Sequence, residues 1–243
     1  MTMAADTSAN VKINLIDVWL THKPCRPRKI LILENFMWVT ETCSGLTTSI
    51  GGMNDTKKLK YFVLTGDPGV GKTTIIKRIC ECLQGKGVKT SGIYTEEVRT
   101  NGIREGFDVI SLNGVKGRLA RDQRLLSTPA KYKVGKYGVL IQEFENIALP
   151  TLQKDEDCKL CLVIDEIGKM EFYSIPFKNR IKEIFTNNSN NFVIATIPIR
   201  NSDPLIELIR HHNEAKVWVV TRGNRNIIYE DIVKEIFCNI LSN

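Results

Sequence analysis

Long hydrophobic runs are missing from this sequence of 243 residues. No run approaches the ~18 consecutive apolar residues that a membrane-spanning helix needs. The N-terminus also lacks a basic stretch followed by an apolar core, so we expect no secretory signal. These absences favour an intracellular protein without membrane contact, which we expect in the cytoplasm. Asp6, Asp17 and Glu34 weaken, without excluding, an organelle-targeting role for the N-terminal segment.

Histidine is scarce, with three residues in the whole chain, and their positions do not suggest a catalytic histidine. The seven cysteines are an odd number, and we expect reduced thiols. Cys158 and Cys161 fit the C-x-x-C spacing, but a second pair of zinc ligands is missing. Cys161 also begins an apolar stretch, so a role in the core is the expectation and a metal site is the alternative.

The most specific motif present is a glycine-rich stretch that fits G-x-x-x-x-G-K-[ST] without a mismatch. It consists of Gly66, Asp67, Pro68, Gly69, Val70, Gly71, Lys72 and Thr73. An apolar segment typical of a buried strand precedes it, and an amphipathic helix is predicted to follow it. The alternative is a glycine turn that merely precedes a helix, and the combination of strand, loop and helix argues against it.

This arrangement of strand, loop and helix is suited to phosphate. Glycines let successive backbone N–H groups point inward, and the helix N-terminus adds its positive dipole end. Lys72 is expected to reach the β- and γ-phosphates, while the Thr73 hydroxyl is expected to ligate Mg²⁺. The sequence therefore predicts that the protein binds a nucleoside triphosphate.

A second motif lies about ninety residues later, where the apolar residues 160–164 are followed by Asp165 and Glu166. Ligands of open α/β sheets bind at the carboxyl ends of the strands, so Asp165 is placed to hold Mg²⁺. Glu166 can orient and deprotonate an attacking water. A carboxylate directly beside the metal-binding aspartate favours hydrolysis over transfer, because a kinase must exclude water from its site.

Two other functions remain open. The protein could be a kinase of a small molecule or polynucleotide, with Asp165 or Glu166 activating the acceptor hydroxyl. It could also be an RNA- or partner-binding module gated by the nucleoside triphosphate, with slow hydrolysis acting as a timer. The net charge of +7 is spread along the chain, and triphosphate binding alone could explain it, so RNA binding is possible but not indicated. The Asn-Lys-x-Asp motif that reads guanine is absent, which leaves base selectivity undefined. We expect a monomer.

The chain divides into an N-terminal extension and an α/β domain. Residues 1–58 look poorly ordered, with a Thr/Ser/Gly-rich loop expected from Thr40 to Asp55. From residue 59 to 243, strand and helix signals alternate, which predicts a mostly parallel sheet with helices on both faces. Strands are expected at 60–65, 90–94, 107–112, 138–142, 159–164, 192–197 and 216–221. Helices are expected at 72–84, 145–153, 172–186, 204–211 and 225–241, and residues 98–136 are expected to form a hairpin plus an exposed loop.

Charge that develops on the γ-phosphoryl group calls for an arginine beyond the P-loop lysine. Arg225 is the first candidate, because it is predicted to open the last helix at the carboxyl edge of the sheet. A solvated arginine is the alternative, and Arg118 or Arg121 is the next candidate. Lys169 and Glu171 are either partners of the catalytic residues or solvated residues at a helix start.

Several further motifs occur in one order. They are Gly92–Arg99 (GIYTEEVR), Gly106–Val109 (GFDV), Val163–Glu171 (VIDEIGKME), Ala195–Pro198 (ATIP) and Asn224–Asn226 (NRN). Together with the P-loop, they make residues 60–240 resemble the THEP-type nucleoside-triphosphatase family. Residues 1–59 depart from the compact family pattern.

The resemblance implies a RecA/AAA-like P-loop fold and slow hydrolysis of several nucleoside triphosphates to diphosphate and phosphate. It also implies that nucleotide-binding segments map onto the P-loop and onto a second stretch. That second stretch is Cys161, Leu162, Val163, Ile164, Asp165, Glu166, Ile167 and Gly168.

Overall fold

The structure, a computed structural model, describes residues 31–33, 37–42, 45–49, 58–153, 160–187, 191–200 and 203–241. The chain forms two compact units, Met1–Thr56 and Lys57–Asn243. Most of the predicted N-terminal extension and Cys158 lie outside the described residues, so the expectations for them stay predictions.

The described part of the first unit is a small antiparallel sheet. Its strands are β1 (Leu31–Leu33), β2 (Met37–Thr42) and β3 (Gly45–Ser49), paired in the order β1-β2-β3. The prediction of a loop from Thr40 onward is therefore wrong for β3 and for the end of β2. Thr40 pairs with Thr47 and Val39 with Thr48. These β-branched side chains suit an extended backbone, which outweighs the turn tendency of the nearby glycine and serine.

The second unit is built on one sheet of nine strands in the order β12-β4-β11-β10-β5-β6-β7-β9-β8. Five neighbouring strands run parallel: β12 (Ala215–Val219), β4 (Tyr61–Gly66), β11 (Phe192–Pro198), β10 (Cys161–Ile164) and β5 (Thr90–Thr100). An antiparallel extension follows: β6 (Ile103–Ser111), β7 (Lys116–Asp122), β9 (Tyr137–Val139) and β8 (Tyr132–Val134). Strand β11 lies between β4, which carries the P-loop, and β10, which carries Asp165.

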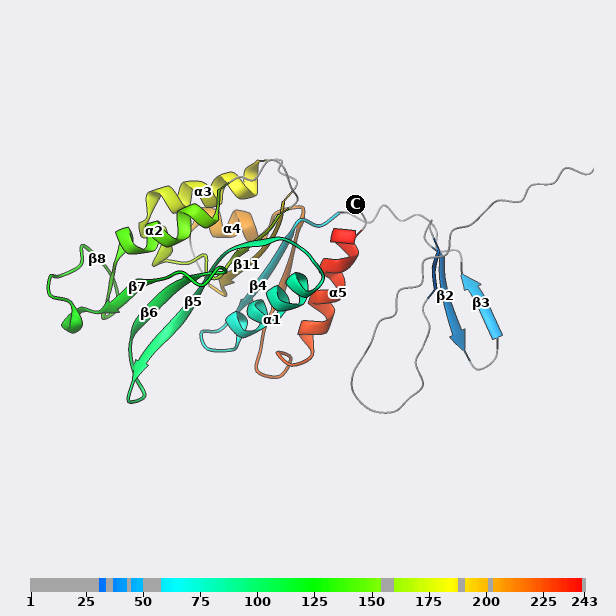
Figure 1. The fold of residues 1–243 in the computed structure, drawn as a ribbon, viewed down its shortest axis with the longest axis horizontal. Helices are drawn as coiled ribbons and strands as arrows, with labels where there is room; N and C mark the ends of the chain where they lie inside the picture. Colours follow the sequence, from blue (N-terminus) through cyan, green and yellow to red (C-terminus); the bar gives the residue numbers. More distant parts are fainter. Residues whose placement is uncertain are drawn as a thin grey trace, which may run out of the picture. The chain divides into compact units, whose positions relative to one another are not determined.

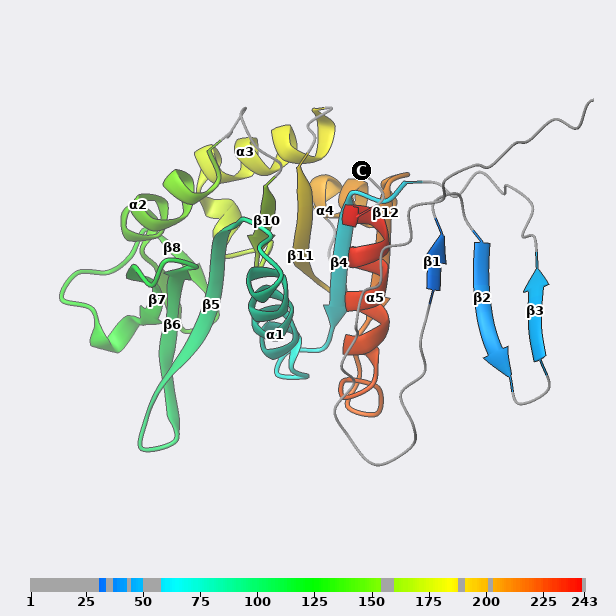
Figure 2. The same ribbon diagram turned by 45° about the vertical axis from the view of Figure 1, so that its right-hand side comes forward.

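Helices cover both faces of this sheet (Figures 1 and 2). Helices α1 (Lys72–Gly85) and α5 (Ile228–Leu241) pack on one face, in a core cluster that includes Ile76 and Ile232. Helices α2 (Ile141–Thr151), α3 (Ile175–Thr186) and α4 (Pro204–Arg210) pack on the other, around Phe144, Phe177 and Ile206. The predicted fold class, a P-loop sheet with helices on both faces, is confirmed.

Two local expectations are wrong. Helix α2 begins at Ile141, inside the strand expected at 138–142. The exposed loop expected before residue 136 contains β7, whose Leu119 and Ala120 are fully buried. Arginines flank this short apolar pair, so the sequence resembles a polar loop. Pairing with β6 and β9 on either side makes a strand the better state, since it satisfies the backbone N–H and C=O groups.

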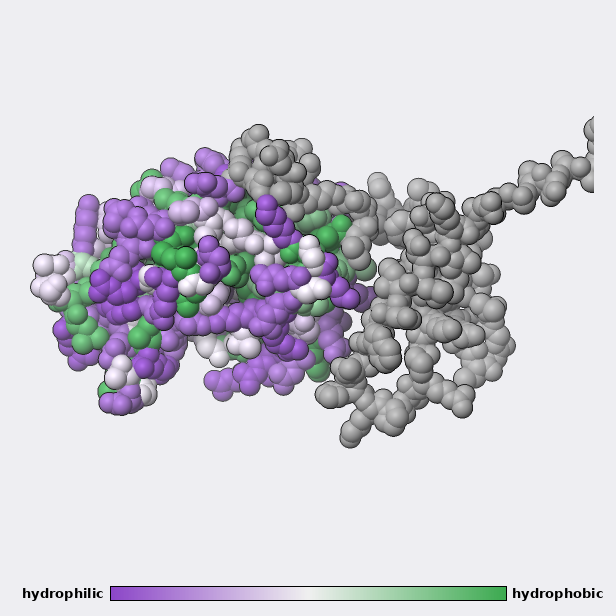
Figure 3. Space-filling model, viewed as in Figure 1, coloured by the Kyte–Doolittle hydropathy of each residue, from purple (hydrophilic) through white to green (hydrophobic). Residues whose placement is uncertain are grey.

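The surface of this unit is mainly hydrophilic on the face seen in Figure 3, with smaller hydrophobic patches between charged side chains. Among the described residues, every helix is too short or too polar to cross a bilayer.

Candidate active site

The P-loop connects the end of β4 to the start of α1. Gly66 and Gly71 both have positive φ, at +154° and +111°, which side chains rarely allow. A Cβ atom on Gly66 would lie 2.4 Å from the carbonyl oxygen of Val220, just past β12. The loop thus turns tightly against the neighbouring strand, and only glycine fits at its first position.

Lys72 is the first residue of α1, and its side chain folds back into the loop. The residue is 8% exposed, and its Nζ donates hydrogen bonds to the carbonyl oxygens of Gly66 (2.9 Å) and Asp67 (3.3 Å). The ammonium group is therefore held inside the curl of the P-loop, where the phosphates were predicted to bind.

Asp165 follows β10 at the carboxyl edge of the sheet and is 1% exposed. The hydroxyl of Thr196, on β11, donates a hydrogen bond of 2.5 Å to its Oδ1. Burial raises the pKa of Asp165, while hydrogen bonding from the hydroxyls of Thr196 and Thr73 and the charge of Lys72 oppose the rise. The fold thus brings together Thr73 and Asp165, the two residues predicted to hold the metal.

These oxygens suit a hard cation. Oδ2 of Asp165 is buried and has no hydrogen-bond partner among the described residues, an unusual state for a carboxylate oxygen. In the described part of the chain, no three histidine, cysteine, aspartate or glutamate residues form a group that could hold a metal ion by themselves. A site with one carboxylate and one hydroxyl fits Mg²⁺, which is commonly held by one or two protein oxygens together with substrate phosphates.

Glu166 lies beside Asp165 and lines a cleft that opens in front of the P-loop. Burial raises the pKa of Glu166, and the charge of Lys72 partly offsets the rise. Glu171 and Glu166 both lie next to Gly168. A Cβ on Gly168 would lie 3.0 Å from Oε2 of Glu171 and 3.5 Å from Oε1 of Glu166. Glu171 is 5% exposed, so it is not a solvated residue at a helix start. Its burial, with the nearby charge of Glu166, raises the pKa of Glu171 to about 8.

The cleft has a volume of about 1310 Å³ and two ends. The end formed by the P-loop and α1 is lined by Pro68, Gly69, Gly71, Lys72, Thr73, Thr74 and Lys77. Glu166 and Gly168 lie between this end and a wall made by the antiparallel strands and the segment after β10. A phosphate chain on the P-loop would therefore point its γ end toward Glu166.

Comparisons with known proteins agree with this geometry. Residues 61–233 match the sequence profile of the NTPase family. The cancer-related nucleoside-triphosphatase homolog of Mus musculus is 43% identical over 183 residues, which span 72% of this chain and 95% of that protein. The nucleoside-triphosphatase THEP1 of Thermotoga maritima is 39% identical over 177 residues, which span 73% of this chain and 95% of that protein. The chain belongs to the THEP-type nucleoside-triphosphatase family.

Two solved structures of this family resemble the chain. The crystal structure of THEP1 from Aquifex aeolicus aligns with a TM-score of 0.63 at 40% identity, over 71% of this chain and 96% of that one. The solution structure of a human cancer-related nucleoside triphosphatase gives the same TM-score and identity, over 73% and 97%. The relatives are named as hydrolases of nucleoside triphosphates, and the predicted enzyme class is confirmed.

The second nucleotide-binding segment implied by the family is mostly interior. Only Glu166 and Gly168 from it line the cleft. The others are at most 1% exposed and do not line it: Cys161, Leu162, Val163, Ile164, Asp165 and Ile167. The buried part of this segment holds Asp165 and Glu166 at the edge of the sheet. A direct contact between its apolar residues and a nucleotide stays a prediction.

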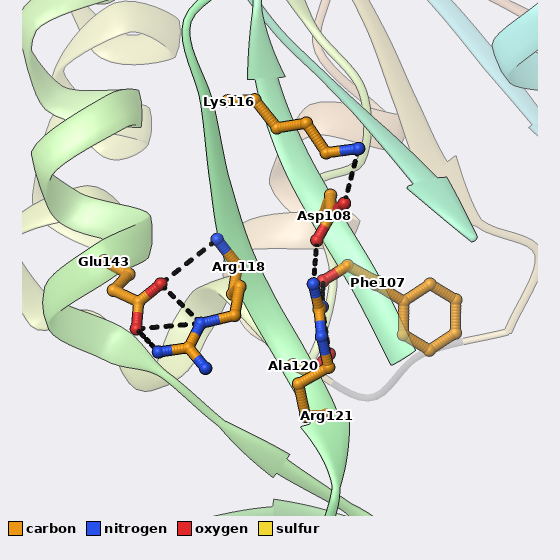
Figure 4. A network of polar contacts seen from close by, with 7 residues as sticks. All are labelled: Phe107, Asp108, Lys116, Arg118, Ala120, Arg121 and Glu143. Atoms are coloured by element: carbon orange, nitrogen blue, oxygen red, sulfur yellow. Dashed lines mark hydrogen bonds and ion pairs between the residues drawn. The ribbon is translucent and has the colours of Figure 1, made fainter. Parts of the chain in front are cut away.

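The three arginines predicted as candidates for contact with the γ-phosphoryl group lie in different places. Arg225 precedes α5, which begins at Ile228, so it does not open the helix as predicted. Its exposed side chain nevertheless comes close to the P-loop, with Cδ 3.7 Å from a Cβ built on Gly71. Arg118 and Arg121, both on β7, instead form ion pairs with Glu143 of α2 and Asp108 of β6 (Figure 4).

Sequence reasoning missed Arg200, which lines the cleft. Arg200 is exposed, and no hydrogen bond or ion pair of its side chain occurs within the described ranges. It follows β11 as Asp165 follows β10, so both leave the sheet at its carboxyl edge. That position after an apolar strand is the sequence signal that could have pointed to it.

Proposed function

We propose that this protein hydrolyses nucleoside 5′-triphosphates, ATP and GTP among them, to diphosphate and phosphate with Mg²⁺ as cofactor. We further propose broad base specificity and a monomeric enzyme. The cleft that Lys72 and Thr73 of the P-loop line together with Glu166 carries the proposal, because it joins a phosphate-binding loop to a carboxylate that can activate water. The family supports triphosphate hydrolysis, and the resemblance to it implies several nucleoside triphosphates as substrates.

Each residue has a defined part in this mechanism. The P-loop amides and Lys72 bind the β- and γ-phosphates, and the ammonium exchanges its carbonyl partners for phosphate oxygens. Thr73 and Asp165 would hold Mg²⁺, which neutralises charge on the phosphate oxygens when bound. Glu166 accepts a proton from the attacking water. The water oxygen bonds to the γ-phosphorus and displaces the nucleoside diphosphate, which leaves inorganic phosphate as the other product.

Phosphate release by the purified full-length chain tests this function. We expect release from ATP, GTP, CTP and UTP with Mg²⁺, and none above the uncatalysed rate in excess EDTA. Lys72→Ala should nearly abolish triphosphate binding in a calorimetric titration. Glu166→Gln should keep binding but slow turnover by roughly 10²–10⁴-fold, the usual contribution of a general base.

A matched control is Glu81→Gln, which changes an exposed glutamate on α1 outside the cleft. Its turnover should equal that of the unmodified chain. If Glu166→Gln behaves like this control, water activation lies with another group. Phosphate that appears only after an acceptor hydroxyl is added would identify a kinase instead.

A further inference from the structure

The cleft is larger than hydrolysis requires. Its volume of about 1310 Å³ exceeds the ~300–1,000 Å³ of a typical small-molecule site. A hydrolase needs room for the triphosphate and one water, and a water occupies only ~30 Å³. In the strand order of the sheet, β10 with Glu166 separates β4 and its P-loop from β5, β6 and β7, so the part of the cleft lined by these strands lies beyond the position expected for the γ-phosphate.

We call this far end the outer compartment, and its wall is apolar. It is lined by Phe107, Leu119, Val134, Met170, Phe172 and Tyr173. These residues come from β6, β7, β8 and the turn after β10, and they pack against the core, which holds them in place. Neighbouring rings fix two of the aromatic side chains: Tyr173 stacks on another tyrosine at 4.8 Å, and Phe107 meets one edge-on at 5.3 Å.

Cations stand beside these rings. The guanidinium carbon of Arg104 lies 5.5 Å from the centre of the Phe107 ring, and Nζ of Lys178 lies 4.9 Å from that of Phe172. Arg104 and Lys178 also form ion pairs with acidic residues that line the same cleft. Arg200 is exposed and unpaired among the described residues, so its charge is available to a ligand. An apolar aromatic wall with convergent cations suits an aromatic ring that carries negative charge.

We propose that the outer compartment binds a second small molecule, an aromatic anion, while a nucleoside triphosphate occupies the P-loop. The rings and Val134 contact the aromatic part, and Arg200 pairs with the anionic group. Simultaneous binding rests on the proposed function, since it requires a triphosphate at the P-loop. Binding of the aromatic anion does not rest on the proposed function, because none of the residues proposed to contact the anion belongs to the phosphate site.

A fluorescence titration of the full-length chain with 8-anilinonaphthalene-1-sulfonate, an aromatic sulfonate, tests the proposal. The titration is made with and without saturating Mg²⁺ and the β,γ-imido analogue of ATP. We expect one saturable site that persists when the P-loop is filled. Val134→Trp fills the compartment and should weaken dye binding about tenfold or more. Val115→Trp is the matched control at an exposed position outside the cleft and should change nothing.

Two further variants separate charge and nucleotide effects. Arg200→Ala should weaken dye binding several-fold, whereas Arg222→Ala, exposed and outside the cleft, should not. Lys72→Ala should lose nucleotide binding and keep its affinity for the dye. Displacement of the dye by the ATP analogue, loss of dye binding in Lys72→Ala, or equal affinity in Val134→Trp and Val115→Trp would each overturn the proposal. None of these outcomes depends on whether the protein hydrolyses its nucleotide.

Discussion

The hydroxyl of Thr196 donates a hydrogen bond to Oδ1 of Asp165, and this bond joins β11 to β10 at the carboxyl edge of the sheet. Both residues are at most 1% exposed. Because β11 also pairs with β4, Thr196 lies between the strand of the P-loop and the strand of the acidic pair. It fixes one oxygen of Asp165 and leaves the other oxygen, Oδ2, without a partner among the described residues.

Thr196→Val should therefore damage both folding and metal use. The substitution keeps the shape of the side chain but removes a hydrogen bond to a buried carboxylate, which costs about 1–3 kcal/mol of unfolding free energy. We expect a lower midpoint in urea and a higher Mg²⁺ concentration for half-maximal phosphate release. Thr196→Ser retains the hydroxyl and should stay close to the unmodified chain. Equal Mg²⁺ requirements for the valine and serine variants would show that Thr196 does not orient Asp165.

The arginine beside the P-loop can be tested kinetically. Arg225 approaches Gly71 from beyond β12, so we expect Arg225→Ala to lower kcat much more than it weakens binding of Mg²⁺–ATP. An arginine that stabilises the γ-phosphoryl transition state is worth about 10³-fold or more in the best-studied cases. Steady-state phosphate release at saturating Mg²⁺–ATP, beside calorimetric binding, measures both quantities. An unchanged kcat would remove Arg225 from the mechanism.

Glu171 makes stability depend on pH. Its pKa rises from the ordinary 4.5 to about 8 in the folded chain, so between these values the folded state binds more protons than the unfolded state. Unfolding free energy should consequently fall as pH rises through this window, by up to about 1.4 kcal/mol per pH unit. Glu171→Gln removes the titrating group and should flatten this slope. Urea unfolding at pH 5, 6, 7 and 8 measures it, with Glu81→Gln as the control.

Burial also raises the pKa values of Asp165 and Glu166, so these residues contribute to the slope in the same direction. The difference between Glu171→Gln and the unmodified chain isolates the contribution of Glu171. Parallel slopes in the two proteins would mean that Glu171 is ionised in the folded state at neutral pH.

Removal of residues 1–58 should leave a folded and active enzyme. The family match begins at residue 61, and the described lining of the cleft begins at Pro68. We expect the truncated chain to unfold in one transition and to release phosphate at a rate within a few-fold of the full-length rate. A soluble, folded but inactive truncation would show that the first unit contributes to the site.

The P-loop, the acidic pair and the alternation of strands and helices were all readable in the sequence. Gly66 to Thr73 act through the local backbone, and Lys72 and Thr73 take their positions from the helix that begins there. Asp165 and Glu166 follow an apolar strand, and in a parallel sheet the end of such a strand lies on the same edge as the P-loop. These features depend on short-range patterns, which the sequence contains in full.

Tertiary structure decided the parts that depend on distant neighbours. Thr196 was part of a recognised motif, but only the position of β11 between β4 and β10 brings its hydroxyl to Asp165. From the sequence, Glu171 could be a partner of the catalytic residues or a solvated residue at a helix start. It is buried, because the turn after β10 packs it against Gly168, close to Glu166. Arg200 lines the cleft, and Arg118 and Arg121 form ion pairs from β7, the second strand of the antiparallel extension, where the sequence indicated a loop. Burial and charge pairing depend on which segments are in contact across the sheet. These contacts follow from the strand order rather than from the local sequence.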